Sequence, residues 1–275
     1  MKQMDMHMHS YFSDGNKDLH QIAKEVEEKG LSLFSLTDHD CISGTNEMKE
    51  IMKSKAINFL PGVEISSTFK MMEFHLLVYN YDDQNQDFLN LLASNIKIRF
   101  LYDQDLITEL VKLKTPGVSL DDFNAFEDEP YRGGWPSINY LMSIGLVKEF
   151  KDYIKLTACV PRMVFPKPKE VIDIAHGCGA KVILAHPSSN ERGGLRHEIL
   201  DQFLEDGIDG MECFSPYHTS EEEVNAYIHY CRANGLVVSG GSDYHGGYIG
   251  RAMGVPKVMS DKADYDFFMD LIEKI

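Results

Sequence analysis

The sequence lacks the features of a secreted or membrane-bound protein. Its five cysteines are an odd number and include no CxxC pair, so neither a disulfide framework nor a thiolate zinc site is predicted. The longest apolar runs, such as "VILA" and "GLVV", are far shorter than the roughly 20 residues that cross a bilayer. The beginning, "MKQMDMHMHS", has neither the basic start nor the apolar run of a signal peptide. We therefore expect a cytoplasmic protein with free thiols and no membrane partner.

Positive charge is also in short supply. Lys and Arg number 27 against 43 Asp and Glu, which gives a formal net charge of −16. A protein that binds duplex DNA by neutralising many phosphates needs the opposite balance, so no duplex DNA partner is expected. A small anionic substrate is still compatible with the composition, because bound divalent ions can reverse the local field.

The apolar residues occur in short Val-, Leu- and Ile-rich runs that alternate with amphipathic stretches. This alternation is typical of an α/β protein with a parallel sheet and helices outside it, and the number of units favours closure into a barrel. Predicted strands cover 4–9, 31–38, 57–66, 71–81, 180–187, 208–214 and 236–243, and predicted helices cover 18–30, 43–53, 167–179, 195–207 and 220–235. Asp18 is the expected N-cap of the first helix, and Gly30 its end.

The middle of the chain differs from both flanks. Residues 87–161 show helical periodicity and no convincing strand. We interpret them as a helical insertion, a cap or small lobe beside the site. The barrel is then formed by residues 1–86 and 162–275.

Candidate metal ligands recur at or near the ends of the predicted strands. In a β/α barrel the carboxyl ends of the strands meet at one mouth, so residues far apart in sequence converge there. His7 and His9 alternate with methionines and therefore share one face of the first strand. The complete set is His7, His9, Asp14, His39, Glu64, His75, His186, Asp243 and His245.

The donor types indicate the chemistry. Imidazole and carboxylate without thiolate suit Zn, Mn or Fe. One zinc ion needs about four ligands, so a set of this size predicts two or three divalent ions. We expect Glu64, in a tight "PGVE" turn, to bridge them. Clustered ions serve phosphoester hydrolysis, because they activate water and hold the phosphate oxygens.

Six segments in this order resemble the polymerase and histidinol phosphatase (PHP) superfamily: "HMHSYFSDG", "TDHD", "PGVE", the His of "FHLL", "AHP" and "GSDYHG". The resemblance extends from His7 to about Gly250. It is greatest to the stand-alone branch that hydrolyses nucleoside 3′,5′-bisphosphates and trims short RNA from the 5′ end. It implies a distorted (β/α)7 barrel with a helical insertion and a trinuclear metal centre.

The same resemblance distributes the ligands among three ions. It implies that His7, His9, Glu64 and Asp243 bind the first ion, and that Asp14, His39 and His245 bind the second. Glu64, His75 and His186 would bind the third ion, with Glu64 as the bridge. The residue pattern alone predicts the ligand set but not this division.

The substrate-binding residues depart from the pattern of the branch. A "GRPH"-like segment is usual in the insertion, whereas this chain has "YRGGWPSINYL". Arg132 keeps the arginine, and Arg99 falls where the branch places an arginine on the preceding helix. We expect one of these two arginines to neutralise the phosphate oxygens. Metal-bound water, His245 or Asp14 could protonate the leaving oxygen.

These observations predict a metal-dependent phosphatase or phosphoesterase acting on a small nucleotide or the 5′ end of a short RNA. Two alternatives stay open. Another branch of the superfamily cleaves histidinol phosphate, although it more often carries His at the position of Asp14. Some polymerase-associated members are non-catalytic accessory domains, which the full set of ligands disfavours.

Overall fold

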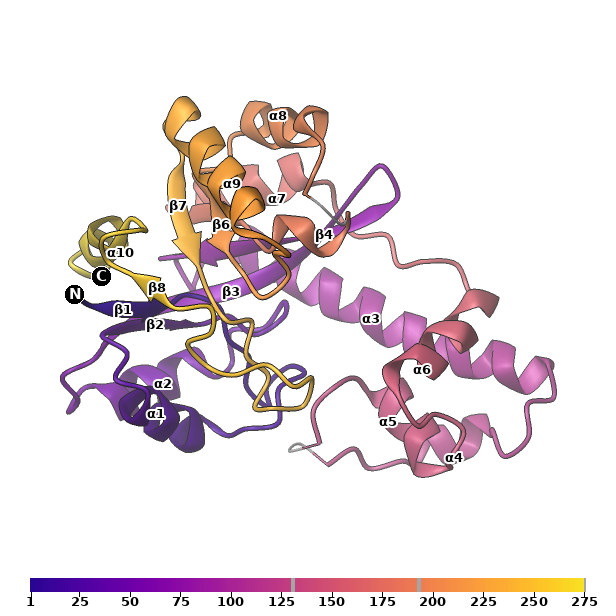
Figure 1. Cartoon of the computed structure of the whole chain (residues 1–275). Coiled ribbons are helices and arrows are strands. Elements are labelled where there is room, and N and C mark those ends of the chain that lie inside the picture. Colours follow the sequence, from indigo (N-terminus) through magenta and orange to yellow (C-terminus); the bar gives the residue numbers. More distant parts are fainter. Residues whose placement is uncertain (130–131, 192–193, 275) are drawn as a thin grey trace.

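The computed structural model describes residues 1–129, 132–191 and 194–274. An eight-stranded sheet runs through the molecule in the order β7-β6-β5-β4-β3-β2-β1-β8 (Figure 1). The strands are β1 (Gln3–Asp5), β2 (Leu33–Leu36), β3 (Asn58–Phe69), β4 (Met72–Tyr79), β5 (Lys181–Leu184), β6 (Gly210–Phe214), β7 (Val237–Gly240) and β8 (Val258–Met259).

The sheet curls into a nearly closed barrel. The Met6 N–H donates to the Gly240 carbonyl at 3.1 Å, and Met8 forms a parallel bridge with Tyr244. These contacts join the region after β1 to the last residue of β7 and the loop that follows it. The predicted α/β barrel is therefore confirmed.

Two strands break the parallel arrangement. β4 runs antiparallel to both β3 and β5, and the short β8 runs antiparallel to β1. The remaining neighbours, from β1 to β3 and from β5 to β7, are parallel. The reversal at β4 follows from a short connection, because β3 ends at Phe69 and β4 begins at Met72. A parallel crossover would need a dozen or more residues.

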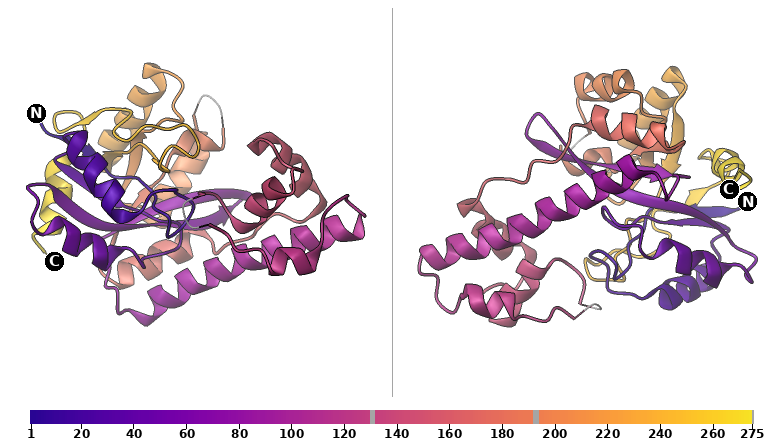
Figure 2. Two further views of the ribbon diagram at one scale, coloured as in Figure 1. Left: turned by 90° about the horizontal axis from the view of Figure 1, so that it is seen from below. Right: turned by 180° about the vertical axis from the view of Figure 1, so that it is seen from behind.

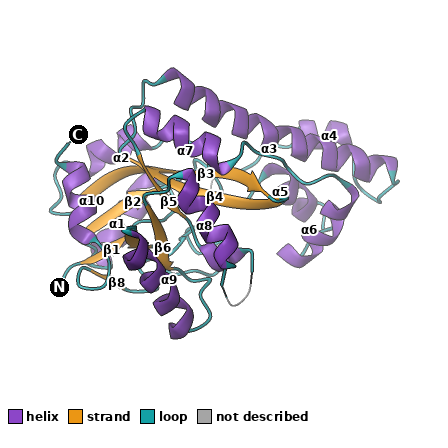
Figure 3. Cartoon of the chain, turned by 90° about the horizontal axis from the view of Figure 1, so that it is seen from above, coloured by secondary structure: helices purple, strands orange, loops and turns teal. Residues whose placement is uncertain are grey.

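Helices cover the outside of the barrel (Figures 2 and 3). They are α1 (Leu19–Glu28), α2 (Thr45–Met52), α7 (Pro168–Gly177), α8 (His197–Asp206), α9 (Glu221–Asn234) and α10 (Tyr265–Ile272). The first helix begins as predicted. The Asp18 carboxylate accepts the Gln21 N–H, and the Gln21 side-chain oxygen accepts the Asp18 N–H. It ends before Gly30, whose φ of 67° suits glycine.

The first strand is shorter than predicted, although its alternation persists. Ladder pairing ends at Asp5, before the two histidines. Met4, Met6 and Met8 are all fully buried in the core. Because side chains alternate across an extended chain, the intervening His7 and His9 both face away from the methionines. Burial of the three methionines on one side of the chain therefore determines that both histidines lie on the other side.

The predicted turn at "PGVE" is wrong, because these residues lie inside the 12-residue strand β3. Pro61 pairs with Leu36, the last residue of β2, where the ladder is already ending. Gly62 lies against the side chain of Ser35, and a Cβ atom at this position would lie 2.3 Å from Ser35 Oγ. The glycine therefore permits close strand packing rather than a turn.

A helical lobe lies beside the barrel between β4 and α7 (Figure 1). It contains α3 (Gln86–Lys112), α4 (Leu120–Asn124), α5 (Pro136–Ser143), α6 (Phe150–Leu156) and the 3₁₀ turn η1 (Thr157–Cys159). Leu106, Ile107 and Leu141 belong to a hydrophobic cluster within this lobe. The Gly134 N–H donates to the Asp14 carbonyl at 2.8 Å and so ties the lobe to the barrel mouth. The domain boundaries at 87 and 161 stay a prediction.

Across the described residues, no helix combines the length and the apolar composition that crossing a membrane requires.

The hydrogen bond between Tyr79 and Met6 provides a test of the barrel core. Tyr79 Oη donates to the Met6 carbonyl at 2.7 Å, and both residues are fully buried. Tyr79→Phe removes this donor from a buried carbonyl, so we expect the free energy of unfolding in urea to fall by about 1–3 kcal/mol.

Tyr265→Phe is the matched control. The Tyr265 hydroxyl is buried without a hydrogen-bond partner among the described residues, so its removal should leave the free energy of unfolding nearly unchanged. Equal losses in the two variants would contradict the role given to the Tyr79 hydroxyl.

Candidate metal centre

The barrel mouth brings together all nine predicted ligands. Most of them follow the carboxyl end of a parallel strand: His7 and His9 follow β1, His39 follows β2, His186 follows β5, and Asp243 and His245 follow β7. His75 reaches the same mouth from the first half of β4. It pairs with Ser66 on β3, and because β4 is antiparallel, its amino-terminal half lies beside the carboxyl-terminal half of β3.

The innermost group contains His7, His9, Glu64 and Asp243, all fully or almost fully buried. The Nε2 atoms of His7 and His9 are 3.1 Å apart. Each lies 3.1 Å from Glu64 Oε2. Asp243 Oδ1 lies 3.3 Å from His7 Nε2 and 3.1 Å from His9 Nε2. Two ligands bound at about 2.1 Å to one ion are separated by roughly 3.0–3.4 Å, so these atoms are spaced as ligands of a common ion.

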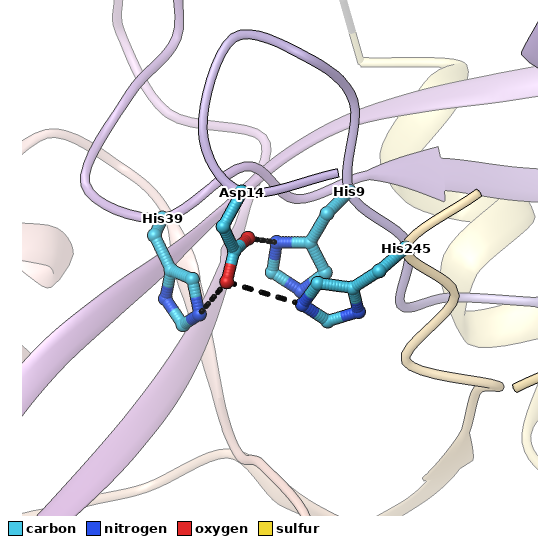
Figure 4. Close-up of side chains that lie close together, drawn as sticks. All are labelled: His9, Asp14, His39 and His245. Carbon is cyan, nitrogen blue, oxygen red and sulfur yellow. Dashed lines mark ion pairs between the residues drawn. The ribbon is translucent and has the colours of Figure 1, made fainter. Parts of the chain in front are cut away.

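A second group surrounds Asp14. Its carboxylate points between the rings of His9, His39 and His245 (Figure 4). Asp14 Oδ2 lies 3.3 Å from His245 Nε2 and 3.8 Å from His39 Nε2. Asp14 Oδ1 lies 3.5 Å from His9 Nδ1. Three imidazoles and a carboxylate thus each place a ligand atom within 4.8 Å of the others, beside the innermost group.

The third group lies on the other side of Glu64. Glu64 Oε1 lies 3.0 Å from His75 Nδ1 and 2.9 Å from His186 Nε2. Because Oε2 faces the innermost group, the two oxygens of Glu64 address different sets of nitrogens. His39 also takes part, since its Nδ1 lies 3.2 Å from Glu64 Oε2. This arrangement suits a bridging carboxylate.

The donor set fits divalent ions. Glu64 Oε2, His9 Nδ1 and His39 Nδ1 are buried without a hydrogen-bond partner among the described residues. Buried polar atoms are rarely left this way unless something else satisfies them. Nitrogen and carboxylate donors suit Zn, Mn or Fe. A cation bound beside Glu64 Oε2 would satisfy this oxygen without a proton.

The electrostatics of the metal-free protein support this interpretation. Burial lowers the pKa of His7, but Glu64 and Asp243 outweigh it and raise the pKa well above its usual value. Burial likewise opposes the charge of His9, but the Asp243 and Glu64 carboxylates, each 3.1 Å from its Nε2, raise its pKa to about 10. The carboxylates therefore favour a cationic charge at this point, which protons or metal ions can supply.

A buried carboxylate that sequence reasoning missed orients two of the ligands. Glu212 is fully buried in β6 and lies 3.2 Å from His7 Nδ1. It also accepts the His186 N–H at 2.7 Å. A carboxylate behind a ligand imidazole fixes the ring and leaves its other nitrogen to face the metal. The signal was present in "GMECF", where one acid interrupts a buried strand, because a buried charge needs a partner.

Two further buried carboxylates hold the ligand loops. Asp5 accepts N–H groups from Ser242 and Gly254, both at 2.8 Å, and so ties β1 to the loop that carries Asp243. Asp38 accepts the Ser10 N–H at 2.8 Å and the Ser13 hydroxyl at 2.6 Å, next to Asp14. These contacts order the backbone on which the ligands stand.

Two ligands also have unusual backbone conformations. His186 has a φ of 23°, and Asp243 has a φ of 49°. Residues other than glycine avoid this region at a cost of about 1–3 kcal/mol each, and such strain gathers at functional sites. The surrounding hydrogen bonds hold both residues in place.

A cavity of about 740 Å³ opens onto the three groups. Its floor contains ligands from all of them, and its opposite wall comes from the helical lobe and the loop after β7. The wall is mainly apolar and aromatic: Trp135, Ile138, Met142, Phe150, Tyr153, Tyr248 and Ile249. Two cationic residues also line the cavity, Lys148 and Arg251.

The two arginines predicted to contact phosphate are not among the lining residues. Arg99 is held by ion pairs to Asp40 at 3.3 Å and Glu73 at 3.4 Å. Its guanidinium carbon lies 4.6 Å from the centre of the Trp135 ring and 5.1 Å from that of Phe165. Arg99 thus packs behind the wall of the cavity, and its contact with phosphate stays a prediction.

Arg132 is turned toward the lobe. Its Nη1 donates to the Asn139 carbonyl at 3.4 Å, and its guanidinium carbon lies 5.9 Å from the centre of the Phe126 ring. Its predicted role likewise stays a prediction. Asp14 and His245, the candidate proton donors, do line the cavity.

Comparison with known proteins agrees with this site. The PHP domain matches residues 5–160, more than half of the chain. A 5′-3′ exoribonuclease from Haemophilus influenzae is 27% identical over 251 residues, covering 89% of this chain and 90% of the relative. A 3′,5′-nucleoside bisphosphate phosphatase from Chromobacterium violaceum is 26% identical over 262 residues, covering 92% of this chain and 91% of the relative.

A solved structure has the same fold. A protein from Bifidobacterium adolescentis, described as a candidate metal-dependent phosphoesterase, superposes with a TM-score of 0.79. It is 24% identical, and the match covers 98% of this chain and 94% of the other. The chain therefore belongs to the PHP family of metal-dependent phosphoesterases. The predicted class of enzyme, a metal-dependent phosphoesterase, is thereby confirmed.

The raised pKa values predict proton release on metal binding. Burial opposes the charge of His75, but Glu64 and Glu73 raise its pKa to about 10, the same value as for His9. Both rings are therefore protonated at pH 7 in the metal-free protein, whereas a ligand imidazole must be neutral. We expect Mn to displace more than one proton per chain, and its apparent affinity to rise with pH toward about 10.

Calorimetry in two buffers of different protonation enthalpy measures this release. An observed enthalpy that is the same in both buffers, together with a pH-independent affinity, would contradict the proposed ligation by these histidines.

Proposed function

We propose that the protein hydrolyses phosphomonoesters of small nucleotides, with nucleoside 3′,5′-bisphosphates and the 5′ ends of short RNA as the leading substrates. The observation that carries the proposal is the convergence of three ligand groups, two of which share Glu64, at the floor of a cavity. The exoribonuclease and bisphosphate phosphatase names of the two relatives support this class of substrate.

The proposed metal ligands are the nine residues at the mouth. We propose two or three divalent ions, Mn, Zn or Fe, since the nitrogen and oxygen donors accept each of them. His7, His9, Glu64 and Asp243 would hold one ion, and Asp14, His39 and His245 a second. Glu64, His75 and His186 would hold the third. When bound, such ions activate water and withdraw charge from the phosphate oxygens.

The hydrogen bonds around His245 favour a role as a ligand. Its Nδ1 lies 2.8 Å from the Asp243 carbonyl, which can only accept, so Nδ1 carries the proton. Nε2 is then the atom left to bind a cation shared with Asp14, whose Oδ2 lies 3.3 Å away. Burial raises the pKa of Asp14, but His245 and His39 outweigh it and hold the carboxyl ionised. We therefore favour Asp14 and His245 as ligands over proton donors.

The wall of the cavity suits an uncharged, planar part of the substrate, such as a base. The Trp135 ring centre lies 5.8 Å from that of His39, so an aromatic surface begins directly beside the ligands. Tyr153 and Tyr248 extend this surface. Nucleobases stack on aromatic side chains without sequence preference. A nucleoside is therefore a suitable occupant of this part of the cavity.

Two alternatives make different demands. A non-catalytic metal-binding domain would not need an open cavity over the ligands. Histidinol phosphate carries a cationic amine, which would require acidic residues on the wall. Among the described residues of the lobe, Glu149 is the one acid in the lining. The mainly apolar wall favours a nucleotide. Five free cysteines agree with a cytoplasmic location, which we also propose.

The proposal predicts a specific pattern of phosphate release. The Mn-loaded protein should release phosphate from nucleoside 3′,5′-bisphosphates or 5′-phosphorylated short RNA faster than from histidinol phosphate. His9→Ala removes Nε2 from the innermost group and Nδ1 from beside Asp14, so turnover should fall by about 10³-fold or more. His229→Ala, on the outer helix α9, is the control and should leave turnover unchanged.

A colorimetric phosphate assay over a panel of phosphorylated metabolites, nucleotides and short RNAs measures both effects. Undiminished activity of His9→Ala, or full activity in metal-free buffer, would contradict the proposal.

A further inference from the structure

We propose that Arg251 binds the non-bridging oxygens of the substrate phosphate, and this proposal rests on the proposed phosphomonoesterase function. Arg251 follows the loop after β7 and lines the cavity together with ligands of all three groups. The residue does not belong to the ligand set, and neither the strand-end pattern nor the phosphate-binding segments of the insertion pointed to it.

Arg251 lies next to the proposed metal positions. Its Nη1 forms an ion pair with the Asp243 carboxylate and a 3.3 Å hydrogen bond to the Asp243 carbonyl. The other carboxylate oxygen, Asp243 Oδ1, is the one that faces His7 and His9 at 3.3 and 3.1 Å. A single carboxylate therefore separates the guanidinium from the innermost group, so a phosphate bound over that group would lie close to Arg251.

The guanidinium is held in one orientation by stacking. Its central carbon lies 4.3 Å from the centre of the Tyr217 ring. That ring in turn packs on His186, with centroids 4.9 Å apart. Stacking on an aromatic face fixes the plane of a guanidinium while leaving its edge available. The orientation of Arg251 is thus linked, through Tyr217, to a proposed metal ligand.

The donor count leaves capacity for phosphate. A guanidinium has five N–H donors in a rigid fork that matches two oxygens of a phosphate. Both hydrogen bonds to Asp243 leave from Nη1, so they occupy one end of the fork. The side chain is 19% exposed, which places it at the cavity surface but mostly out of bulk water. Contacts to phosphate are stronger in such a position.

The other cations of the region are less suitable. Arg99 is engaged by Asp40 and Glu73 and packs between two aromatic rings. Lys148 lines the far wall and is exposed, on the segment between α5 and α6. It is suited to a more distant part of the substrate, such as a second phosphate. Arg251 is the cavity-lining cation in contact with a proposed ligand.

The test uses inorganic phosphate, the product of the proposed reaction, as the probe. Calorimetric titration of the Mn-loaded protein should show phosphate binding at least about tenfold weaker for Arg251→Met than for the unmodified protein. Arg251→Lys keeps the charge without the planar fork and should fall between the two. With the best ester substrate, KM should rise and kcat should fall in the same order.

Arg232→Met is the matched control. Arg232 forms a 2.6 Å ion pair with Asp264 away from the cavity, so its loss should leave phosphate binding unchanged. Arg251 contacts the proposed ligand Asp243, so its substitution could also weaken metal binding. The Mn content of each variant is therefore measured by atomic absorption. Weaker phosphate binding by Arg251→Met at undiminished Mn content supports direct contact.

Three results would overturn the proposal: no phosphate binding by the unmodified protein, equal affinity in Arg251→Met, or a loss of phosphate binding that only follows a loss of Mn. The proposed function fails separately. If the unmodified protein binds phosphate in an Arg251-dependent manner but releases none from any ester, Arg251 is a phosphate ligand and the phosphomonoesterase proposal is wrong.

Discussion

The buried carboxylate of Glu64 is the constraint on which the rest of the site depends. Burial raises its pKa, but His7, His39 and His75 outweigh that effect and hold it well below the usual value. An ionised carboxylate without such partners would cost several kcal/mol in the interior. Glu64 lies at the mouth on the long strand β3, and the imidazoles that surround it lie on or directly after other strands. The barrel therefore brings together one buried carboxylate and several imidazoles that lie far apart in the sequence.

A second layer of carboxylates keeps this assembly in register. Glu212 holds the ring of His7 and the backbone of His186, while Asp5 and Asp38 tie the ligand loops to neighbouring strands. The helical lobe joins the same network, because Gly134 donates to the Asp14 carbonyl. A shift of the lobe would thus also displace the backbone of Asp14. The wall that shapes the cavity and the ligands on its floor are parts of one hydrogen-bonded structure.

The sequence predicted the barrel, the helical middle and all nine residues that meet at the mouth, because periodicity and strand ends are local signals. It could not predict the direction of β4, which brings His75 to the mouth, nor that "PGVE" is a strand whose glycine packs on Ser35. Both depend on neighbouring strands. The phosphate contact of Arg99 or Arg132 stays a prediction; Arg99 is paired with Asp40, and the sequence did not point to Arg251, which lines the cavity. Side-chain pairing of this kind is decided by tertiary contacts that a single sequence does not display.

Native mass spectrometry of the Mn-loaded protein tests the central role of Glu64 most directly. Glu64→Gln keeps the size of the side chain but removes the charge that both groups of nitrogens share. The account predicts two or three ions on the unmodified chain and a loss of at least one ion, with more than tenfold weaker binding of the rest. An unchanged number of ions bound with unchanged affinity by Glu64→Gln would contradict it.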